Sequence, residues 1–414
     1  MKVLWFTNIP VLSSGVLGRK DRIGGWLESM ASEIKDHNKI ELGISFYHDK
    51  KTNPFTSSGV KLYPVYNGLD KKINVRSRKL CNTDEGNNDP VAFKEIIVDF
   101  QPDIIHIHGT ELAFGRIMDL TSVPVVFSIQ GILTVYAHFF YRGMNPCEYK
   151  SFTPWKNKLR LSALHSKYSL FKKKAIREQE FLSKCSHVIG RTGWDKRVCS
   201  ILAPSARYYH NDEILRGGFY ENKWRFNGNE KFTIYTTTTD SVYKGLETVF
   251  ETAILLSRKL NIDYIWKIGG LSLSDSFVKV CLKKYGRDFP ADNVIFSGPL
   301  DEASVIGEML NADLYIMPSH IENSSNSLCE ALILGLPVIA TFAGGTDSLL
   351  ENGSEGILIQ DGDPWSMAGA VAEMHSCQDK STKYGEMARK RALIRHDRKR
   401  NADELINIYS TVIS

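Results

Sequence analysis

The chain has 414 residues, of which 43% are hydrophobic and 24% are charged, and its formal net charge is +5. This length favours two domains, and the composition is that of an ordinary globular protein. No apolar run approaches the roughly 18–20 residues that a membrane-spanning helix needs, and the apolar start is too short for a signal peptide. Seven scattered cysteines without Cys-x-x-Cys spacing argue against a disulfide framework and a zinc site, so we expect a cytoplasmic protein.

Short apolar runs alternate with helical stretches along both halves of the chain, which predicts an α/β protein with parallel sheets covered by helices. In the first half, strands are expected at 1–7, 40–47, 60–65, 103–108, 123–129 and 187–191. In the second half, they are expected at 232–236, 263–268, 293–297, 313–317, 337–341 and 356–359. Residues 66–90 read as a polar loop, 206–229 as a linker between domains and 379–414 as helical.

Paired glycines, Gly24 and Gly25, precede a predicted helix that begins with Trp26. Glycines at a strand-to-helix turn let the backbone approach a phosphate or sugar closely, and a helix N-terminus favours negative charge. Gly24 and Gly25 are therefore candidate ligand-binding residues, although the same pair also suits a simple tight turn.

Two histidines, His106 and His108, share one face of the strand that ends near Gly109. The sequence offers no further ligands for a metal at this point, so no metal site is expected. His108 either contacts a substrate or is a hydrogen-bonded core histidine. The next strand ends at Gln130, which can form hydrogen bonds but cannot exchange a proton near neutral pH.

Positive charge is concentrated in residues 141–180, which contain ten Lys or Arg and three Glu among aromatic and leucine side chains. Such a surface suits anionic lipid head groups or a lipid-diphosphate-linked acceptor. A solvated helical face around ordinary core residues would give the same pattern. No nucleic-acid recognition motif accompanies the charge, so a nucleic-acid partner is not expected.

Glu322 and Glu330 stand eight positions apart, after an apolar strand and with small polar residues between them. The pattern predicts a strand, then a polar loop, then a helix that begins near Asn326. The free backbone N–H groups of the first turn of such a helix can bind an anion. The loop glutamate and the helix glutamate can then contact two different parts of one extended ligand.

With Ala331 and Gly335-Leu336-Pro337-Val338, this segment resembles the Glu-x7-Glu signature of the retaining family-4 glycosyltransferases, including members of bacterial polysaccharide and O-antigen assembly. The resemblance implies the GT-B fold, with two Rossmann-like domains whose parallel sheets face each other across a deep cleft. It assigns 1–205 to the acceptor-side domain and 230–395 to the nucleotide-sugar-binding domain. It also suggests that helix 396–414 crosses back to the first domain.

The resemblance also implies roles for particular residues of the second domain. Glu330 would accept hydrogen bonds from the ribose hydroxyls, and Glu322 would lie near the donor sugar. The backbone N–H groups of Asn326, Ser327 and Leu328 would bind the diphosphate. Lys244, in a Lys-Gly motif, would place a cation beside that diphosphate, and Gly269 would line the nucleotide pocket.

Four positions or segments depart from the family pattern or leave it open. Gln130 stands where many relatives have a histidine that contacts the donor sugar, and Thr236 to Thr239 replace an upstream basic residue. Arg191 either contacts a phosphate near the cleft or forms a structural salt bridge. Asp361-Gly362-Asp363 resembles the Asp-x-Asp of metal-dependent glycosyltransferases, but its place after a late strand indicates a surface turn.

The expected function is retaining transfer of a hexosyl-type sugar from a nucleoside-diphosphate sugar to a glycan or lipid-linked glycan in surface polysaccharide biosynthesis. Neither a metal nor another cofactor is expected. The expected partners are the donor, a lipid-diphosphate-linked or free glycan acceptor, and an anionic membrane surface that holds the protein at the inner face of the cell membrane. A nucleotide-sugar 2-epimerase and a non-catalytic GT-B relative remain as alternatives.

Overall fold

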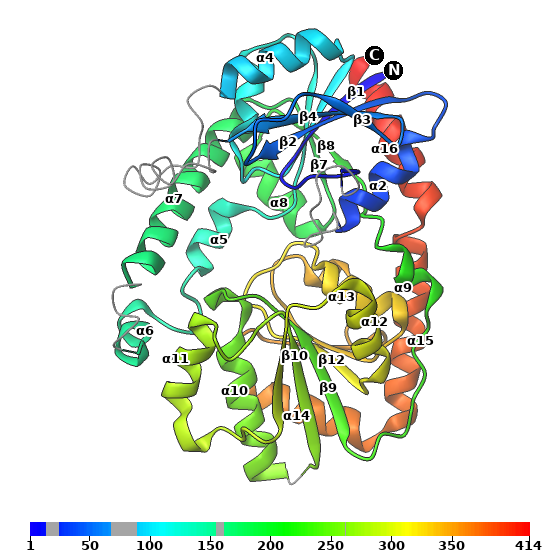
Figure 1. Cartoon of the computed structure of the whole chain (residues 1–414). Helices are drawn as coiled ribbons and strands as arrows, with labels where there is room; N and C mark the ends of the chain where they lie inside the picture. Colours follow the sequence, from blue (N-terminus) through cyan, green and yellow to red (C-terminus); the bar gives the residue numbers. More distant parts are fainter. Residues whose placement is uncertain (14–24, 68–88, 155–160, 261) are drawn as a thin grey trace. The chain divides into compact units, whose positions relative to one another are not determined.

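The structure is a computed structural model of the 414-residue chain, and it describes all residues except 14–24, 68–88, 155–160 and 261. The chain forms two compact units, which are coloured along the sequence in Figure 1. Unit 1 contains Met1–Ala137, Ser166–Arg216 and His396–Ser414. Unit 2 contains His138–His165 and Gly217–Arg395.

Unit 1 is built on an eight-stranded sheet with the order β3-β4-β2-β1-β5-β6-β7-β8. All neighbouring strands are parallel except β3, which pairs antiparallel with β4. The strands are β1 (Lys2–Thr7), β2 (Glu41–His48), β3 (Phe55–Ser57), β4 (Val60–Tyr66), β5 (Ile104–His108), β6 (Val125–Ser128), β7 (His187–Gly190) and β8 (Arg207–His210). The central strand β5 is buried along its whole length, which explains its three isoleucines, and its two histidines are buried with them.

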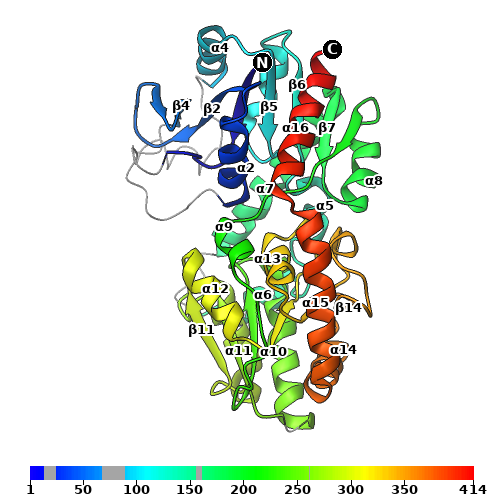
Figure 2. The same cartoon turned by 90° about the vertical axis from the view of Figure 1, so that its right-hand side faces the viewer.

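Helices cover both faces of this sheet. Helices α2 (Gly25–Lys35) and α16 (Arg398–Ile413) pack on one face and lie side by side in Figure 2. The other face is covered by α4 (Asp89–Phe100), the 3-10 helix η1 (Ala113–Asp119), the C-terminal part of α7 (Leu161–Lys184) and α8 (Gly193–Leu202). Helix α5 (Leu133–Phe139) follows β6, and α8 begins at a capping box formed by Thr192 and Asp195.

Unit 2 contains a six-stranded, fully parallel sheet with the order β11-β10-β9-β12-β13-β14. Its strands are β9 (Phe232–Thr237), β10 (Tyr264–Gly269), β11 (Val294–Gly298), β12 (Leu314–Met317), β13 (Val338–Thr341) and β14 (Ile357–Ile359). Helices α6 (Pro146–Phe152), α10 (Leu246–Leu255), α11 (Ser276–Tyr285) and α14 (Pro364–Ser376) contribute to its main hydrophobic core. Helices α9 (Gly217–Glu221), α12 (Glu302–Asn311), α13 (Asn326–Leu334) and α15 (Gln378–Arg395) pack against one another (Figure 2).

The two units confirm the expected α/β class with two parallel, Rossmann-like sheets. All twelve expected strands are present, and β3 and β8 are additional. Helix α4 begins at Asp89, whereas most of the expected polar loop at 66–90 lies outside the described residues. None of the helices in the described ranges is long and apolar enough to span a lipid bilayer.

The units divide the chain at different positions from the expected domains. Residues 138–165 were expected within a 1–205 domain, but they belong to unit 2, where Tyr149 stacks on Phe277 with ring centroids 6.0 Å apart. Glu148 also forms an ion pair with Lys284 at 2.6 Å. The expected linker at 206–229 contains β8 of unit 1 and α9 of unit 2, and residues 396–414 belong to unit 1.

Candidate functional site

Lys244 and Glu322 form the polar centre of unit 2. Nζ of Lys244 lies 2.6 Å from Oε1 of Glu322, which also accepts a hydrogen bond from the Ser319 hydroxyl at 2.8 Å. The Glu322 side chain is 9% exposed and that of Lys244 is 23% exposed, so the lysine retains access to solvent. The sequence predicted both residues as catalytic, and the structure brings them into direct contact.

Two loops at the carboxyl edge of the sheet hold this pair. Lys244 ends the 3-10 helix η3 (Val242–Lys244) after β9, and Gly245 follows with φ of +73°. A Cβ atom at Gly245 would lie 2.0 Å from the carbonyl oxygen of Pro318, so only glycine fits this close approach. Glu322 lies in the loop after β12, where its carbonyl accepts a hydrogen bond from the Gly345 N–H at 3.0 Å.

Lys244 is a cation over the whole neutral pH range. Burial by itself would lower the pKa of this lysine, but Coulombic attraction and the hydrogen bond to Glu322 outweigh burial and raise the pKa above its ordinary value. The site therefore presents a permanent positive charge that is already paired with one carboxylate.

Helix α13 begins four residues after Glu322, at Asn326. The Cys329 N–H donates to the Ser325 carbonyl, so the N–H groups of Asn326, Ser327 and Leu328 precede the first helical hydrogen bond, and the Ser325 side chain forms no cap. Glu330 lies on the same helix and is 6% exposed. The predicted diphosphate-binding segment and both glutamates thus belong to one loop and helix.

Two glycines at the end of β10, Gly269 and Gly270, allow other parts of the chain to approach their backbone closely. A Cβ atom at Gly269 would lie 2.5 Å from the Tyr235 hydroxyl, and one at Gly270 would lie 2.2 Å from the Thr238 carbonyl oxygen. Tyr315 and Thr237 share a hydrogen bond at 2.8 Å. Burial raises the pKa of Tyr315 to about 12, so its hydroxyl stays protonated and acts as a neutral hydrogen-bonding group.

In unit 1, His108 lies in an aromatic cluster at the end of β5. Its ring centroid lies 3.8 Å from that of His106, 4.3 Å from that of Trp5 and 5.9 Å from that of Trp26. Burial, followed by the nearby His106 and Arg191, lowers the pKa of His108 well below its ordinary value. His108 is therefore a neutral imidazole at physiological pH, and its remaining N–H is too weakly acidic to make it an effective general acid.

His106, on the same face of β5, belongs to a buried hydrogen-bonded chain. The Trp5 indole N–H donates to the Tyr409 hydroxyl at 2.9 Å, which lies 2.6 Å from Nδ1 of His106. Nε2 of His106 lies 2.6 Å from the Ser128 hydroxyl. Burial lowers the pKa of His106 to about 3, so His106 is a neutral structural histidine that connects β1, β5, β6 and α16.

Gln130 follows β6, and Gly25 begins α2. The Asn8 side-chain amide donates to Oε1 of Gln130 at 3.1 Å, which fixes the orientation of the glutamine. Gly25 begins α2 with φ of +53°, a backbone conformation that favours glycine, whereas Gly24 lies outside the described residues.

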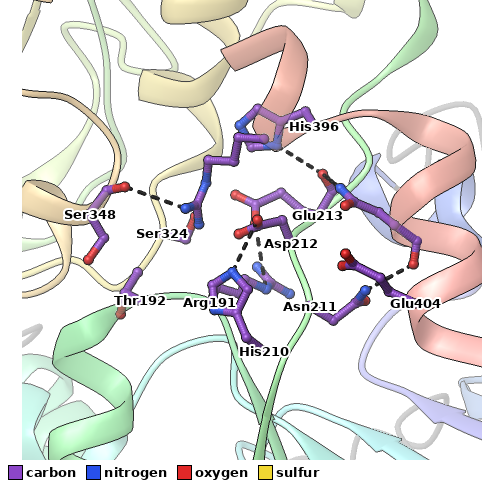
Figure 3. Close-up of polar contacts among 12 residues, drawn as sticks. Arg191, Thr192, His210, Asn211, Asp212, Glu213, Ser324, Ser348, His396 and Glu404 are labelled. Atoms are coloured by element: carbon purple, nitrogen blue, oxygen red, sulfur yellow. Dashed lines mark hydrogen bonds and ion pairs between the residues drawn. The ribbon is translucent and has the colours of Figure 1, made fainter. Parts of the chain in front are cut away.

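Arg191 is buried and contacts two side chains of unit 1. Its guanidinium carbon lies 4.0 Å from the centroid of the Trp26 ring, and its Nε lies 3.8 Å from Oε2 of Glu213. Figure 3 shows Arg191 beside Asp212 and Glu213, while His396 donates from Nδ1 to the Glu213 carbonyl at 2.9 Å. Arg191 thus forms a structural ion pair with Glu213, which was one of the two roles expected from the sequence. Its contact with the Trp26 ring also places it next to the start of α2.

Two groups of residues were missed by the sequence analysis. Trp26 and Tyr409 were not identified, because their partners Arg191 and Trp5 are remote in the sequence. His320 and Glu247 were also missed, although each adjoins a predicted motif, and Nε2 of His320 lies 2.6 Å from Oε1 of Glu247. The signal available in the sequence was the position of these polar residues close to Glu322 and Lys244.

The structure has the expected turn at Asp361-Gly362-Asp363, after β14, but the two aspartates differ in their contacts. Asp363 caps α14 by accepting from the N–H groups of Trp365 and Ser366, which suits a turn. Asp361 instead faces inward, because its Oδ2 lies 3.2 Å from Nδ1 of His320 and 3.2 Å from Nε of Arg142. Asp361 is therefore part of a polar cluster within unit 2.

Solved structures with the same arrangement define the fold as GT-B. Sucrose-phosphate synthase from Thermosynechococcus elongatus superposes with a TM-score of 0.75 at 13% identity, covering 99% of this chain and 98% of that one. Anabaena HepE in complex with UDP and glucose gives 0.65 at 15% identity over 99% and 100% of the chains. A mutant of S. aureus TarM in complex with fondaparinux, alpha-GlcNAc-glycerol and UDP gives 0.67 at 13% identity over 99% of both chains.

Residues 219–391, which form most of unit 2, match the family model described as glycosyl transferases group 1. The D-inositol 3-phosphate glycosyltransferase of Acidothermus cellulolyticus is 32% identical over 108 residues, which is 26% of this chain and 24% of that protein. The enzyme of the same name from Corynebacterium urealyticum is 27% identical over 145 residues, 35% of this chain and 34% of that protein. The matched stretches thus span about a quarter to a third of these relatives.

Proposed function

We propose that this protein is a retaining glycosyltransferase that moves a sugar from a nucleoside-diphosphate sugar to a glycan or lipid-linked glycan. The observation that carries the proposal is the contact between Lys244 and Glu322, four residues before the N-terminus of α13. A cation, a carboxylate and free N–H groups are the parts needed to bind a diphosphate next to a sugar. The match of residues 219–391 to glycosyl transferases group 1 supports the same reaction class.

In the proposed reaction, each residue acts on a part of the donor where charge changes. Lys244 and the N–H groups of Asn326, Ser327 and Leu328 stabilise the departing diphosphate, which gains negative charge as the glycosidic bond breaks. Glu322 interacts with the positive charge that develops at the anomeric carbon, and Glu330 binds the ribose hydroxyls. The departing phosphate takes the acceptor proton, so neither Gln130 nor neutral His108 has to supply an acid.

The structural neighbours and the surface of α7 suggest which donor and acceptor to test. UDP is bound in the HepE and TarM structures, so UDP-sugars are the first donors to test. We propose a hexosyl donor, no metal requirement and a role in surface polysaccharide assembly. The exposed lysines and isoleucine of α7 suit an acceptor presented at an anionic membrane surface.

The testing experiment measures thermal stability with UDP-, GDP- and ADP-sugars and their parent nucleotides, for the wild type and for Glu330→Ala. A ligand that binds only the folded state at 100 times its dissociation constant stabilises it by about 2.7 kcal/mol. We expect one nucleotide series to raise the melting temperature of the wild type, and Glu330→Ala to lose this shift. Donor hydrolysis or transfer is then measured with that series.

The outcomes distinguish the proposed reaction from the two alternatives. Transfer to an added acceptor with the α or β configuration of the donor retained supports the proposal. Interconversion of the nucleotide sugar without any acceptor would instead identify an epimerase. Nucleotide binding without donor turnover, with every acceptor tried, would identify a non-catalytic relative and overturn the proposal.

A further inference from the structure

A buried histidine lies directly behind the proposed catalytic pair in unit 2. His320 is 2% exposed and immediately follows Ser319, which donates to Glu322. Its backbone N–H donates to the Tyr243 carbonyl at 2.9 Å, so the loop of Glu322 is tied to the residue before Lys244.

The imidazole of His320 contacts one carboxylate on each side. Nε2 lies 2.6 Å from Oε1 of Glu247, in the first turn of α10. Nδ1 lies 3.2 Å from Oδ2 of Asp361, in the turn after β14. Both carboxylates can receive a hydrogen bond only when both ring nitrogens carry a proton, because neutral imidazole has one N–H donor.

Residues 142 and 143 close the cluster from a third side. Arg142 contacts Asp361 at 3.2 Å, and Gly143 has φ of +89°. A Cβ atom at Gly143 would lie 2.2 Å from Oε1 of Glu247 and 2.6 Å from Nε2 of His320, so the backbone passes directly over this hydrogen bond. The cluster therefore joins four separate parts of the chain: the Lys244 loop with α10, the Glu322 loop, the turn after β14, and the start of residues 138–165.

We propose that His320 is a positioning residue which, as an imidazolium, holds Lys244 and Glu322 in their paired geometry and releases this geometry when it loses its proton at alkaline pH. The inference rests on the proposed function for its catalytic consequence. His320 acts through its neighbours, because its side chain contacts Glu247 and Asp361 and is itself covered by the protein.

The electrostatic surroundings favour the charged ring. Burial alone would lower the pKa of His320, but the hydrogen bonds and charges of Glu247 and Asp361 raise it above the ordinary value of 6.5. Arg142 contacts Asp361, and Lys284, Asp240 and Glu251 act together with Glu247 on the buried thiol of Cys281, so these charged groups also lie near the cluster. Proton loss from His320 leaves two carboxylates facing a ring with one donor, and the hydrogen bond to one of them is lost.

The test is an NMR titration of the histidine ring carbons of the full-length protein, with the His320 signal assigned from His320→Gln. We expect His320 to titrate above pH 6.5 and to move to lower pH in Glu247→Gln and in Asp361→Asn, since each removes one facing negative charge. Asp363→Asn is the matched control in the same turn and should leave the titration unchanged. The proposal is overturned if His320 titrates below pH 6.5, or if neither substitution changes its titration.

The second readout is the pH profile of donor turnover. We expect kcat to fall at alkaline pH with the pKa found by NMR, and this limb to move to lower pH in Glu247→Gln and Asp361→Asn. In His320→Gln, kcat should be at least tenfold lower and independent of pH over that range, with a smaller effect on KM. If kcat of His320→Gln still falls at alkaline pH as in the wild type, the positioning role is overturned. If the wild type itself shows no turnover at any pH, the proposed function is refuted, and the NMR titration alone decides the protonation of His320.

Discussion

The amino group of Lys244 and the carboxylate of Glu322 are 2.6 Å apart, although the two residues are 78 positions apart in the sequence. In the proposed reaction, an entering diphosphate therefore competes with Glu322 for this cation. We expect Lys244→Ala and Glu322→Ala to reduce donor turnover by roughly 100- to 1000-fold, the usual cost of removing one charged contact to a transition state. Steady-state rates with the donor identified by thermal shift provide the measurement.

Lys231→Ala is the matched control for the lysine, because Lys231 pairs with Asp263 on the exposed surface of the same unit. Its turnover should stay within twofold of the wild type. Circular dichroism and the melting temperature should show that Lys244→Ala is folded. A near wild-type rate in Lys244→Ala would disprove the role given to this lysine.

Gly245 should be intolerant of substitution for two separable reasons. Alanine at Gly245 is strained by φ of +73° and also places its Cβ 2.0 Å from the Pro318 carbonyl oxygen, which forces the Lys244 and Glu322 loops apart. Gly353 has φ of +82° but no atom within 4 Å of such a Cβ, so Gly353→Ala reports backbone strain alone. We expect Gly245→Ala to lose at least tenfold in turnover and more stability than Gly353→Ala. Equal effects in both variants would mean that the close approach does not matter.

The contact between Trp5 and Tyr409 makes a prediction about stability. Tyr409→Phe leaves the indole N–H of Trp5 and Nδ1 of His106 without this partner in a buried site. An unsatisfied buried polar group costs about 1–3 kcal/mol, so urea unfolding of the variant should show a loss of that size. Thr411→Ala, on the exposed side of the same helix, should change stability by less than about 0.5 kcal/mol. An unchanged free energy of unfolding in Tyr409→Phe would show that this chain of hydrogen bonds contributes little to stability.

Glu111 should give unit 1 a pH-dependent stability. Burial, and then the charge of the nearby Glu178, raise the pKa of Glu111 from 4.5 to about 7, although Lys174 and Arg191 act in the opposite direction. The folded state therefore holds this proton at pH values where the unfolded state has lost it. The stabilisation from Glu111 is complete below about pH 4.5 and is lost as the pH rises to about 7.

Urea unfolding at several pH values compares the wild type with Glu111→Gln, which cannot titrate. The stability of the wild type relative to the variant should decrease between pH 4.5 and 7 by up to about 3 kcal/mol, since each pKa unit corresponds to about 1.36 kcal/mol. A difference that does not change with pH would show that Glu111 has an ordinary pKa.

Helix α7 provides a test of membrane association. Lys172, Lys173 and Ile176 are exposed, and Ile176 is 66% accessible. Vesicles with an anionic lipid fraction should bind the protein, and binding should weaken with salt because surface charges are screened over about 10 Å at 0.1 M. A double Lys172→Glu and Lys173→Glu variant should bind less than a Lys383→Glu and Lys390→Glu control, which makes the same charge change on α15. Binding that is independent of salt, or equal in both variants, would contradict this.

The sequence predicted the strands well, because strands buried in a parallel sheet are continuous apolar runs. β5 and β12 are buried throughout and were recognised from this pattern alone. β3 and β8 were missed, since the first has only three residues and the second, Arg207–His210, is short and lies within the segment expected to link the domains. Patterning therefore failed for the two edge strands of the first sheet, although it predicted the edge strands β11 and β14 of the second sheet.

The candidate site was predicted only as far as local motifs extend. The spacing of Glu322 and Glu330 places both on one loop and helix, and the structure agrees. No local pattern could have paired His320 with Glu247, 73 positions away, because that contact depends on how two parallel strands bring their following loops together. The membership of residues 138–165 in unit 2 likewise depends on contacts between segments remote in the sequence, such as that of Tyr149 with Phe277.

The hydrogen bond between Trp5 and Tyr409 has a consequence for biosynthesis, because the two residues are 404 positions apart. As the ribosome delivers the chain, β1 and the rest of the first sheet emerge early, but α16, which covers one face of that sheet, follows the whole of unit 2. Unit 2 can complete its core first, whereas the part of the first sheet that α16 covers stays exposed until that helix is synthesised. We therefore expect unit 1 to complete its packing only after unit 2 has been synthesised.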